Sequence, residues 1–299
     1  MSERAQTLAR VRSELEGHLI CTIDAHNPLA RHNLLVARAR LASRAFAERN
    51  KIPAASSREA ALDEAIFWAV ATDNCEPTST GLARLVVEFG VYEGVSLRRI
   101  AHVFGGSHAR EGGGDDNTIN DDIVAQKETD PYCFDVHAFD SWLGLPEDWV
   151  QTPLSVQRAH QYSLGGKPPL DELWPPRAVP HPGWFNTTVP TFVRGLADES
   201  APLPPRRRFV LAFVHVDCDL YQSTLDALGP LAEAGLLAGP TGDFPGTVLF
   251  FDEYFGYPGW ERHESQAWDE IAARHGIAFE FLHYFGQRVA VRVVAVRGS

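Results

Sequence analysis

Short runs of apolar residues alternate with helical stretches along most of this chain. Six apolar runs occur, and they cover residues 83–91, 133–142, 207–221, 247–254, 278–285 and 288–296. Stretches with the 3.6-residue period of a helix lie between several of them, at 96–104, 223–237 and 265–276. Continuous apolar strands that alternate with helices are typical of a mostly parallel sheet with helices on both faces. The pattern therefore predicts an α/β fold.

The two ends of the chain depart from this alternation. The last two runs are separated only by Gly286 and Gln287, so they predict an antiparallel hairpin at the edge of the sheet. Residues 1–80 contain no strand pattern and predict helices, one ending near Pro53 and one ending before Pro77. We expect a helical lid or oligomerisation segment over 1–80 and the α/β domain over 81–299, with a homodimer as one possible assembly.

Two segments of unusual composition look inserted. Residues 105–130 hold five glycines and seven acids against two bases, and residues 151–183 hold seven prolines. Such composition disfavours regular core elements, so we expect loops here. Loops of this length are either functional or disordered, and the sequence leaves both open.

A glycine turn follows the first apolar run. Glu88, Gly90 and Gly94 stand in E-x-G-x-x-x-G spacing between a strand and a helix, and glycines let the backbone turn sharply and approach a ligand. In open α/β sheets, ligands bind beyond the carboxyl ends of the strands. Asp140 ends the next run, where a carboxylate can accept hydrogen bonds from a ribose diol. A structural turn and a capping role for Asp140 remain the alternatives.

Carboxylates also follow the third and fourth runs. Asp217 and Asp219 follow one, and Asp252 and Glu253 follow the other. Neighbouring acids repel one another unless a cation lies between them, and oxygen ligands suit Mg²⁺. A divalent cation lowers the pKa of a bound hydroxyl, and a nearby carboxylate or histidine can remove its proton. Capping of the following helices is the alternative.

Five segments resemble, in the same order, the macrocin-type sugar O-methyltransferases and the related novobiocin-sugar enzyme. They are EFGVYEG, FDSWLGLPEDW, GWFNTTVP, HVDCDLYQST and FFDEYFGYPGW, within about residues 85–270. The resemblance implies a Rossmann-like class I methyltransferase fold with a seven-stranded, mostly parallel sheet. It also implies S-adenosylmethionine and Mg²⁺ as cofactors, and a hydroxyl of a glycosylated natural product as the methyl acceptor.

The resemblance also assigns roles to residues. It implies that the glycine turn and the end of the second strand bind the cofactor, through Glu88, Gly90, Val91, Tyr92, Gly94, Ser96, Asp140 and Ser141. It implies Mg²⁺ ligation by Asp217, Asp252 and Glu253, with Asp217 as the general base. His215 and His283 are further candidates for that base. The GWF segment, with Trp184, Phe185 and Thr188, is expected near the site or in the packing around it.

The chain departs from the family pattern at one predicted ligand. The family's usual Asp-Asp-Tyr is here Asp252-Glu253-Tyr254, which leaves open whether Glu253 binds metal. Two other functions remain. Asp217-Cys218-Asp219 has the D-x-D form of a metal-dependent glycosyltransferase, and a non-catalytic methyltransferase-like protein fits the departures. Aromatic residues such as Trp142, Tyr257 and Trp260 could line a pocket for a sugar or belong to the core.

The composition of the chain limits the kinds of partner molecule and compartment that we expect. The 299 residues carry 39 acids and 27 bases, a net charge of −12, which argues against a nucleic-acid partner. The four cysteines form no C-x-x-C pair and are expected to be reduced thiols in a cytoplasmic protein. The N-terminal residues lack the apolar core of a signal peptide, and no apolar stretch predicts a membrane span.

Overall fold

The computed structural model describes residues 27–70, 82–104, 135–169, 174–197, 208–242 and 244–297. The predicted insert at 105–130 and the predicted domain boundary at residues 80 and 81 lie outside these ranges, as do three of the four cysteines. The remaining one, Cys218, is a buried free thiol. No helix within the described ranges is long and apolar enough to cross a membrane.

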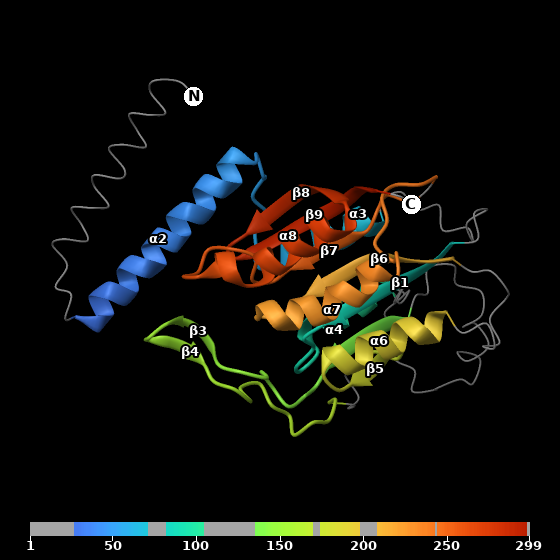
Figure 1. The fold of residues 1–299 in the computed structure, drawn as a ribbon, viewed down its shortest axis with the longest axis horizontal. Coiled ribbons are helices and arrows are strands. Elements are labelled where there is room, and N and C mark those ends of the chain that lie inside the picture. The colour runs from blue at the N-terminus through green and yellow to red at the C-terminus, as the bar shows by residue number, and fades with distance from the viewer. Residues whose placement is uncertain are drawn as a thin grey trace, which may run out of the picture.

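Seven strands form one sheet, shown in Figure 1, in the order β5-β2-β1-β6-β7-β9-β8. They are β1 (Leu82–Phe89), β2 (Val136–Asp140), β5 (Ala178–Pro182), β6 (Arg208–Val216), β7 (Val248–Phe251), β8 (Ile277–Phe285) and β9 (Arg288–Val296). The first five in the sheet order pair in parallel, and β9 pairs antiparallel with both β7 and β8. The expected Rossmann-like fold, with a mostly parallel sheet ending in an antiparallel hairpin, is confirmed.

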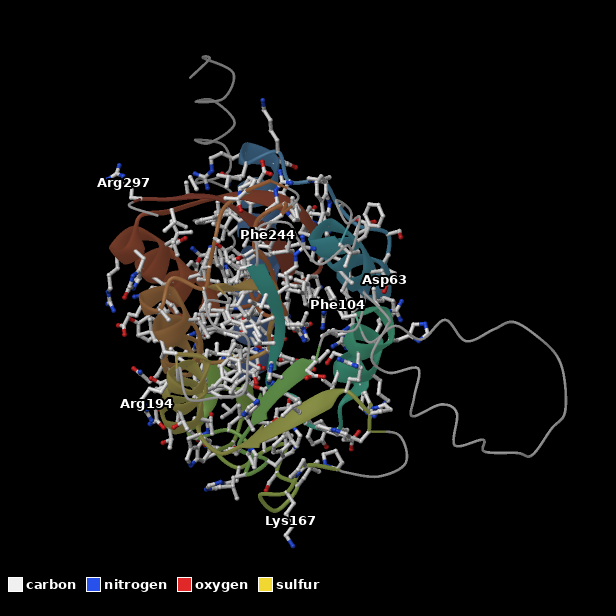
Figure 2. All side chains as sticks on the ribbon, turned by 90° about the vertical axis from the view of Figure 1, so that its right-hand side faces the viewer. Asp63, Phe104, Lys167, Arg194, Phe244 and Arg297 are labelled. Carbon is white, nitrogen blue, oxygen red and sulfur yellow. The ribbon has the colours of Figure 1, made fainter. Side chains whose placement is uncertain are left out.

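Helices cover both faces of the sheet. One core cluster joins strand residues such as Val87 and Val214 to Leu228 and Trp268 of two helices on one face. A second cluster joins Phe213 and its neighbours to helices on the opposite face. The helices on the first face are α6 (Phe185–Leu196), α7 (Tyr221–Glu233) and α8 (Glu264–His275), and those on the second are α3 (Arg58–Val70) and α4 (Val95–Phe104). In Figure 2, side chains fill the space around the sheet, whereas Lys167 and Arg297 lie at the periphery.

The described part of the N-terminal segment is helical, as expected. Helix α2 (Pro28–Arg49) begins at Asn27, whose side chain accepts hydrogen bonds from the backbone N–H groups of Leu29 and Ala30 at 3.1 Å each. Phe46, near its end, packs against the ring of Phe281 in β8. Helix α3 lies over β6, β7, β8 and β9, so it forms part of the helical layer of the sheet.

The expectation of loops throughout 151–183 is wrong. A small hairpin, β3 (Trp149–Thr152) with β4 (Ser155–Gln157), begins this segment, and β5 near its end joins the main sheet. Proline cannot donate a hydrogen bond to a neighbouring strand, but an edge strand has one side free. Pro180 and Pro182 fit in β5 because β5 pairs only with β2.

Candidate active site

A cavity of about 1020 Å³ lies at the carboxyl ends of β1, β2, β6 and β7. Gly90 and Tyr92 line it from the turn after β1, and Asp140 and Ser141 line it from the end of β2. The acids after β6 and β7 line the other end, namely Asp217, Asp219, Asp252 and Glu253. The structure therefore brings the two groups of candidate residues to one cavity.

The glycine turn is shaped by its contact with the end of β6. Gly90 has φ +81°, and a Cβ there would lie 1.9 Å from the carbonyl oxygen of Asp217. The backbone N–H of Gly90 donates to Phe139 O at 3.0 Å, and that of Asp217 donates to Phe89 O at 3.0 Å. Only glycine fits at this position, so the glycine pattern has a packing reason as well as the expected ligand-binding one.

Asp140 holds the glycine turn in place. Its Oδ2 accepts hydrogen bonds from the backbone N–H groups of Val91 at 2.9 Å and Tyr92 at 2.8 Å. Its Oδ1 accepts one from Trp142 at 2.7 Å. A carboxylate oxygen offers two lone pairs, so Oδ1 retains one acceptor position and Oδ2 retains none. The capping alternative for Asp140 is observed, and its expected role with a ribose stays a prediction.

Glu88 lies behind the cavity rather than in its wall. Its side chain is completely buried, and its Oε1 contacts Ser96 Oγ at 2.5 Å and His215 Nδ1 at 2.9 Å. Glu88, Val91, Gly94 and Ser96 are absent from the cavity lining among the residues described. Glu88 and Ser96 therefore bond to each other across the base of the turn, whereas Val91 and Gly94 belong to the turn itself.

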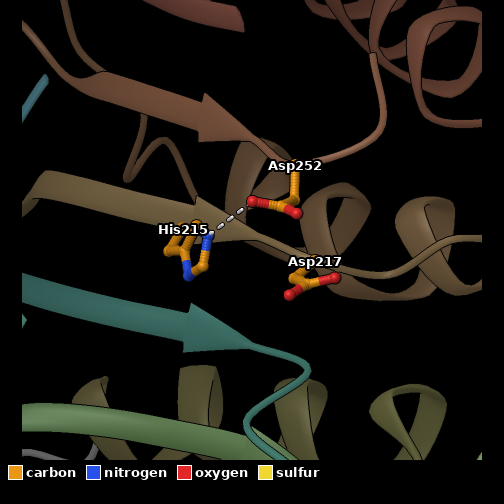
Figure 3. Close-up of side chains that lie close together, drawn as sticks. All are labelled: His215, Asp217 and Asp252. Atoms are coloured by element: carbon orange, nitrogen blue, oxygen red, sulfur yellow. Dashed lines mark ion pairs between the residues drawn. The ribbon is translucent and has the colours of Figure 1, made fainter. Parts of the chain in front are cut away.

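His215 joins Glu88 to the acids. Its Nε2 lies 3.9 Å from Asp252 Oδ1, the contact drawn in Figure 3. Burial opposes protonation of the ring, but the neighbouring carboxylates of Asp252 and Glu88 outweigh it and raise the pKa of His215 to about 10. The three side chains form a continuous buried network from β1 to β7.

The acids form two overlapping groups that share Asp217. His215, Asp217 and Asp252 offer ligand atoms that all lie within 4.8 Å of one another, and so do Asp217, Asp219 and Glu253. Burial and then the charge of Asp252 raise the pKa of Asp217 well above its usual range. Burial and the charge of Asp217 do the same for Glu253. Bringing these carboxylates together without a cation is therefore unfavourable.

Asp252 differs from the other acids because arginines neutralise it. Arg288 contacts both of its oxygens, with Nε at 2.8 Å and an Nη at 2.5 Å, and Arg58 lies 3.5 Å away. Despite the burial of Asp252, His215 and these arginines hold its pKa below the usual range. Neither arginine was predicted, because each comes from an element, β9 or α3, whose sequence indicated only packing.

Glu264 is a further residue that the sequence analysis missed. It is completely buried at the start of α8, and it accepts hydrogen bonds from backbone N–H groups of Cys218 at 2.9 Å, Asp219 at 3.1 Å and Glu253 at 3.2 Å. Burial raises its pKa to about 8, although the bond from Cys218 opposes that shift. An acid at a helix start is common, so its sequence carried no signal of this role.

Other expected residues lie at varied distances from the cavity. Trp184 and Phe185 line it, but Thr188 does not, among the residues described. His283 lies elsewhere, with Nε2 2.7 Å from Ala61 O and Nδ1 3.7 Å from Glu64. Of the aromatic candidates, Trp142, Tyr254, Tyr257 and Trp260 are core residues. Tyr92, Trp149 and Tyr162 line the cavity.

Comparison with protein-family models gives no match, and neither does comparison with curated proteins. Among solved structures, the chain is similar to CalS11, described as a calicheamicin methyltransferase, with 17% identity, a TM-score of 0.49, and coverage of 96% of this chain and 93% of the other. It is also similar to the apo structure of CalS11, described as a TDP-rhamnose 3'-O-methyltransferase in calicheamicin biosynthesis. That match has 15% identity, a TM-score of 0.42, and coverage of 96% and 94%.

Proposed function

We propose that this chain is a Mg²⁺-dependent O-methyltransferase that moves a methyl group from S-adenosylmethionine to a hydroxyl of a sugar or another natural-product small molecule. The shared cavity carries the proposal, because the glycine turn forms one end and the acids form the other. Pockets for one small ligand measure roughly 300–1,000 Å³, so about 1020 Å³ accommodates a cofactor beside a small acceptor.

The glycine-turn end fits a nucleoside. Asp140 keeps one acceptor position on Oδ1 for a ribose hydroxyl, and Ser141 lies next to it in the cavity wall. Tyr92 is 38% exposed, and its ring offers a flat apolar surface. We assign direct cofactor contact to Gly90, Tyr92, Asp140 and Ser141, and support of the turn to Glu88, Val91, Gly94 and Ser96.

The acidic end fits a divalent cation. Oε2 of Glu253 is buried and has no hydrogen-bond partner within the described ranges, beside carboxylates that raise its pKa. Asp217, Asp252 and Glu253 remain the proposed ligands, and Asp219 joins them as a candidate because it lies in the same group as Asp217 and Glu253. When bound, Mg²⁺ would supply positive charge that makes the acceptor hydroxyl easier to deprotonate.

Asp217 is the proposed general base. It belongs to both acidic groups and lines the cavity, so its carboxylate lies where an acceptor hydroxyl beside the cation would give up its proton. His215 fits this role less well, because a pKa of about 10 leaves its ring protonated near neutral pH. His283 does not reach the cavity.

A sugar acceptor agrees with the rings that line the cavity. Trp149, Tyr162 and Trp184 are lining residues, and flat aromatic surfaces pack well against the apolar faces of sugar rings. The five sequence segments that resemble sugar O-methyltransferases support the same acceptor class.

Calorimetry with S-adenosylhomocysteine and Mg²⁺ tests this proposal. We expect the wild-type chain to bind both, and we expect Asp217→Asn to lose Mg²⁺ binding while it keeps S-adenosylhomocysteine binding. The surface variant Asp63→Asn, which removes only an ion pair with Arg99, serves as the control. Absence of S-adenosylhomocysteine binding at millimolar concentration would refute the proposal. A thermal shift with UDP-sugars instead would favour a glycosyltransferase.

A further inference from the structure

Glu264 is a buried carboxylate with an unusual set of partners. It is the first residue of α8, and no part of it is exposed. A carboxylate removed from water is costly unless hydrogen bonds or charges compensate for the lost hydration. Glu264 obtains its compensation from the backbone of two loops rather than from a cationic side chain.

The two loops follow neighbouring strands of the sheet. Oε1 of Glu264 accepts from the N–H groups of Cys218 and Asp219, directly after β6. Oε2 accepts from the N–H of Glu253, directly after β7. The carboxyl group of Glu264 therefore links the ends of β6 and β7 to each other and to α8.

These bonds fix the backbone of two residues whose side chains belong to one acidic group. Asp219 and Glu253 offer oxygens within 4.8 Å of each other and of Asp217. Asp219 has φ +60°, a conformation that residues other than glycine rarely adopt. Such a conformation persists only where the surrounding structure imposes it, and the bond from its N–H to Glu264 contributes to that.

We infer that Glu264 is a positioning residue for the cation site: it holds the Asp219 and Glu253 loops together so that their carboxylates meet beside Asp217. This inference rests on the proposed function, because it requires a cation at the acidic end of the cavity. Both oxygens of Glu264 face backbone donors, so it acts through the loops. Partners that orient metal ligands typically contribute 10–100-fold to metal affinity.

Replacement of Glu264 by glutamine tests the inference. Glutamine keeps the shape and one acceptor oxygen, but its amide N–H₂ cannot accept a bond from a backbone N–H. We expect Glu264→Gln to lower the affinity for Mg²⁺, and for Mn²⁺ measured by electron paramagnetic resonance, at least tenfold. Affinity for S-adenosylhomocysteine should stay within about twofold, because none of the three bonds touches the glycine turn. Glu270→Gln, on the same helix with surface partners Tyr221 and Gln266, is the matched control.

Each outcome bears on a different claim. Wild-type protein that binds neither Mg²⁺ nor Mn²⁺ overturns the proposed function and this inference together. Cation binding in the wild type with unchanged affinity in Glu264→Gln overturns the inference alone. Parallel loss of S-adenosylhomocysteine affinity would show a general structural role and overturn it too. If Glu264→Gln does not fold, Glu264→Asp decides: the carboxyl group remains but its reach is shorter, and cation affinity should still fall selectively.

Discussion

The two ends of the cavity differ in how the charges of their carboxylates are balanced. At the glycine-turn end, Asp140 receives three backbone hydrogen bonds, so its charge is balanced by the protein itself. At the acidic end, Asp217, Asp219 and Glu253 approach one another, and Oε2 of Glu253 has no partner within the described ranges. One end is complete as it stands, whereas the proposed cation would complete the other.

This difference indicates which end depends on ligand for its shape. The glycine-turn end should keep its geometry without cofactor, because backbone hydrogen bonds hold it. The acidic end should gain stability when a cation binds, since the cation removes repulsion between carboxylates. Variants at one end, at the other end, or at the contact between them can test separately whether each end depends on a bound ligand.

The contact between the two ends gives the largest expected effect. Gly90→Ala would place a Cβ 1.9 Å from the carbonyl oxygen of Asp217, at φ +81°. Overpacking and the left-handed conformation together should lower the free energy of unfolding by about 4 kcal/mol. Because the clash moves both strand ends, affinities for S-adenosylhomocysteine and Mg²⁺ should fall together. Urea denaturation and calorimetry measure these effects.

Gly165→Ala is the matched control for the backbone conformation. Gly165 has φ +71°, but nothing lies within 4 Å of a Cβ there. Its cost should be limited to the left-handed conformation, about 1 kcal/mol. If Gly90→Ala were no more destabilising than Gly165→Ala, the two ends would not be in the close contact described.

The sequence predicted the strands well because their apolar runs are long and continuous. It did not predict β5, since Pro180 and Pro182 are unfavourable in a strand that has neighbours on both sides. Their acceptance depends on the position of β5 at the edge, beside β2, which is a tertiary property. The small hairpin of β3 and β4 was missed for a related reason, because strands this short carry little pattern.

The candidate site likewise contains some residues that the sequence pattern identifies and others that only the tertiary structure brings together. Acids at strand ends are visible in the sequence, and Asp217 and Asp252 do meet at the cavity. Glu264 and Arg288 come from α8 and β9, and only the fold brings them to these acids. Asp219 was named among the acids at the strand ends and in the D-x-D form but not as a metal ligand, because nothing local shows that its side chain turns toward Glu253.

Arg288 tests whether Asp252 belongs functionally to the acidic end. Arg288→Gln removes the two hydrogen bonds that neutralise a buried carboxylate, which should cost about 3 kcal/mol in the absence of metal. The freed Asp252 can then contribute to the cation site. Addition of Mg²⁺ should therefore raise the stability of the variant by more than it raises that of the wild type. Thermal unfolding across a Mg²⁺ titration measures this.

The surface arginine of another bidentate pair provides the comparison for Arg288. Arg99→Gln breaks an exposed pair with Asp63 and should change stability by less than about 1 kcal/mol, with no change in the response to Mg²⁺. An Arg288→Gln variant that responds to Mg²⁺ only as strongly as the wild type would place Asp252 outside the cation site.

The smallest of these effects concerns pH and β2, the strand that leads to the glycine-turn end. His137 lies on β2, the strand that ends at Asp140, and its Nδ1 is 3.0 Å from His181 Nε2 on β5. Burial, and then the charge of His181, lowers the pKa of His137 from 6.5 to about 4. Between these values, the unfolded chain binds a proton that the folded chain does not, so acidification favours unfolding.

We therefore expect the titration of His137 to lower the free energy of unfolding by about 2 kcal/mol when the pH falls from 7 to 5. His137→Gln should remove that part of the loss, because its amide can still hydrogen-bond to His181 but does not titrate. His102→Gln, at an exposed position on α4, should leave the loss unchanged. Urea denaturation at both pH values provides the measurement. Equal losses in wild type and His137→Gln would show that the pairing of β2 with β5 through His137 and His181 is not the source of acid sensitivity.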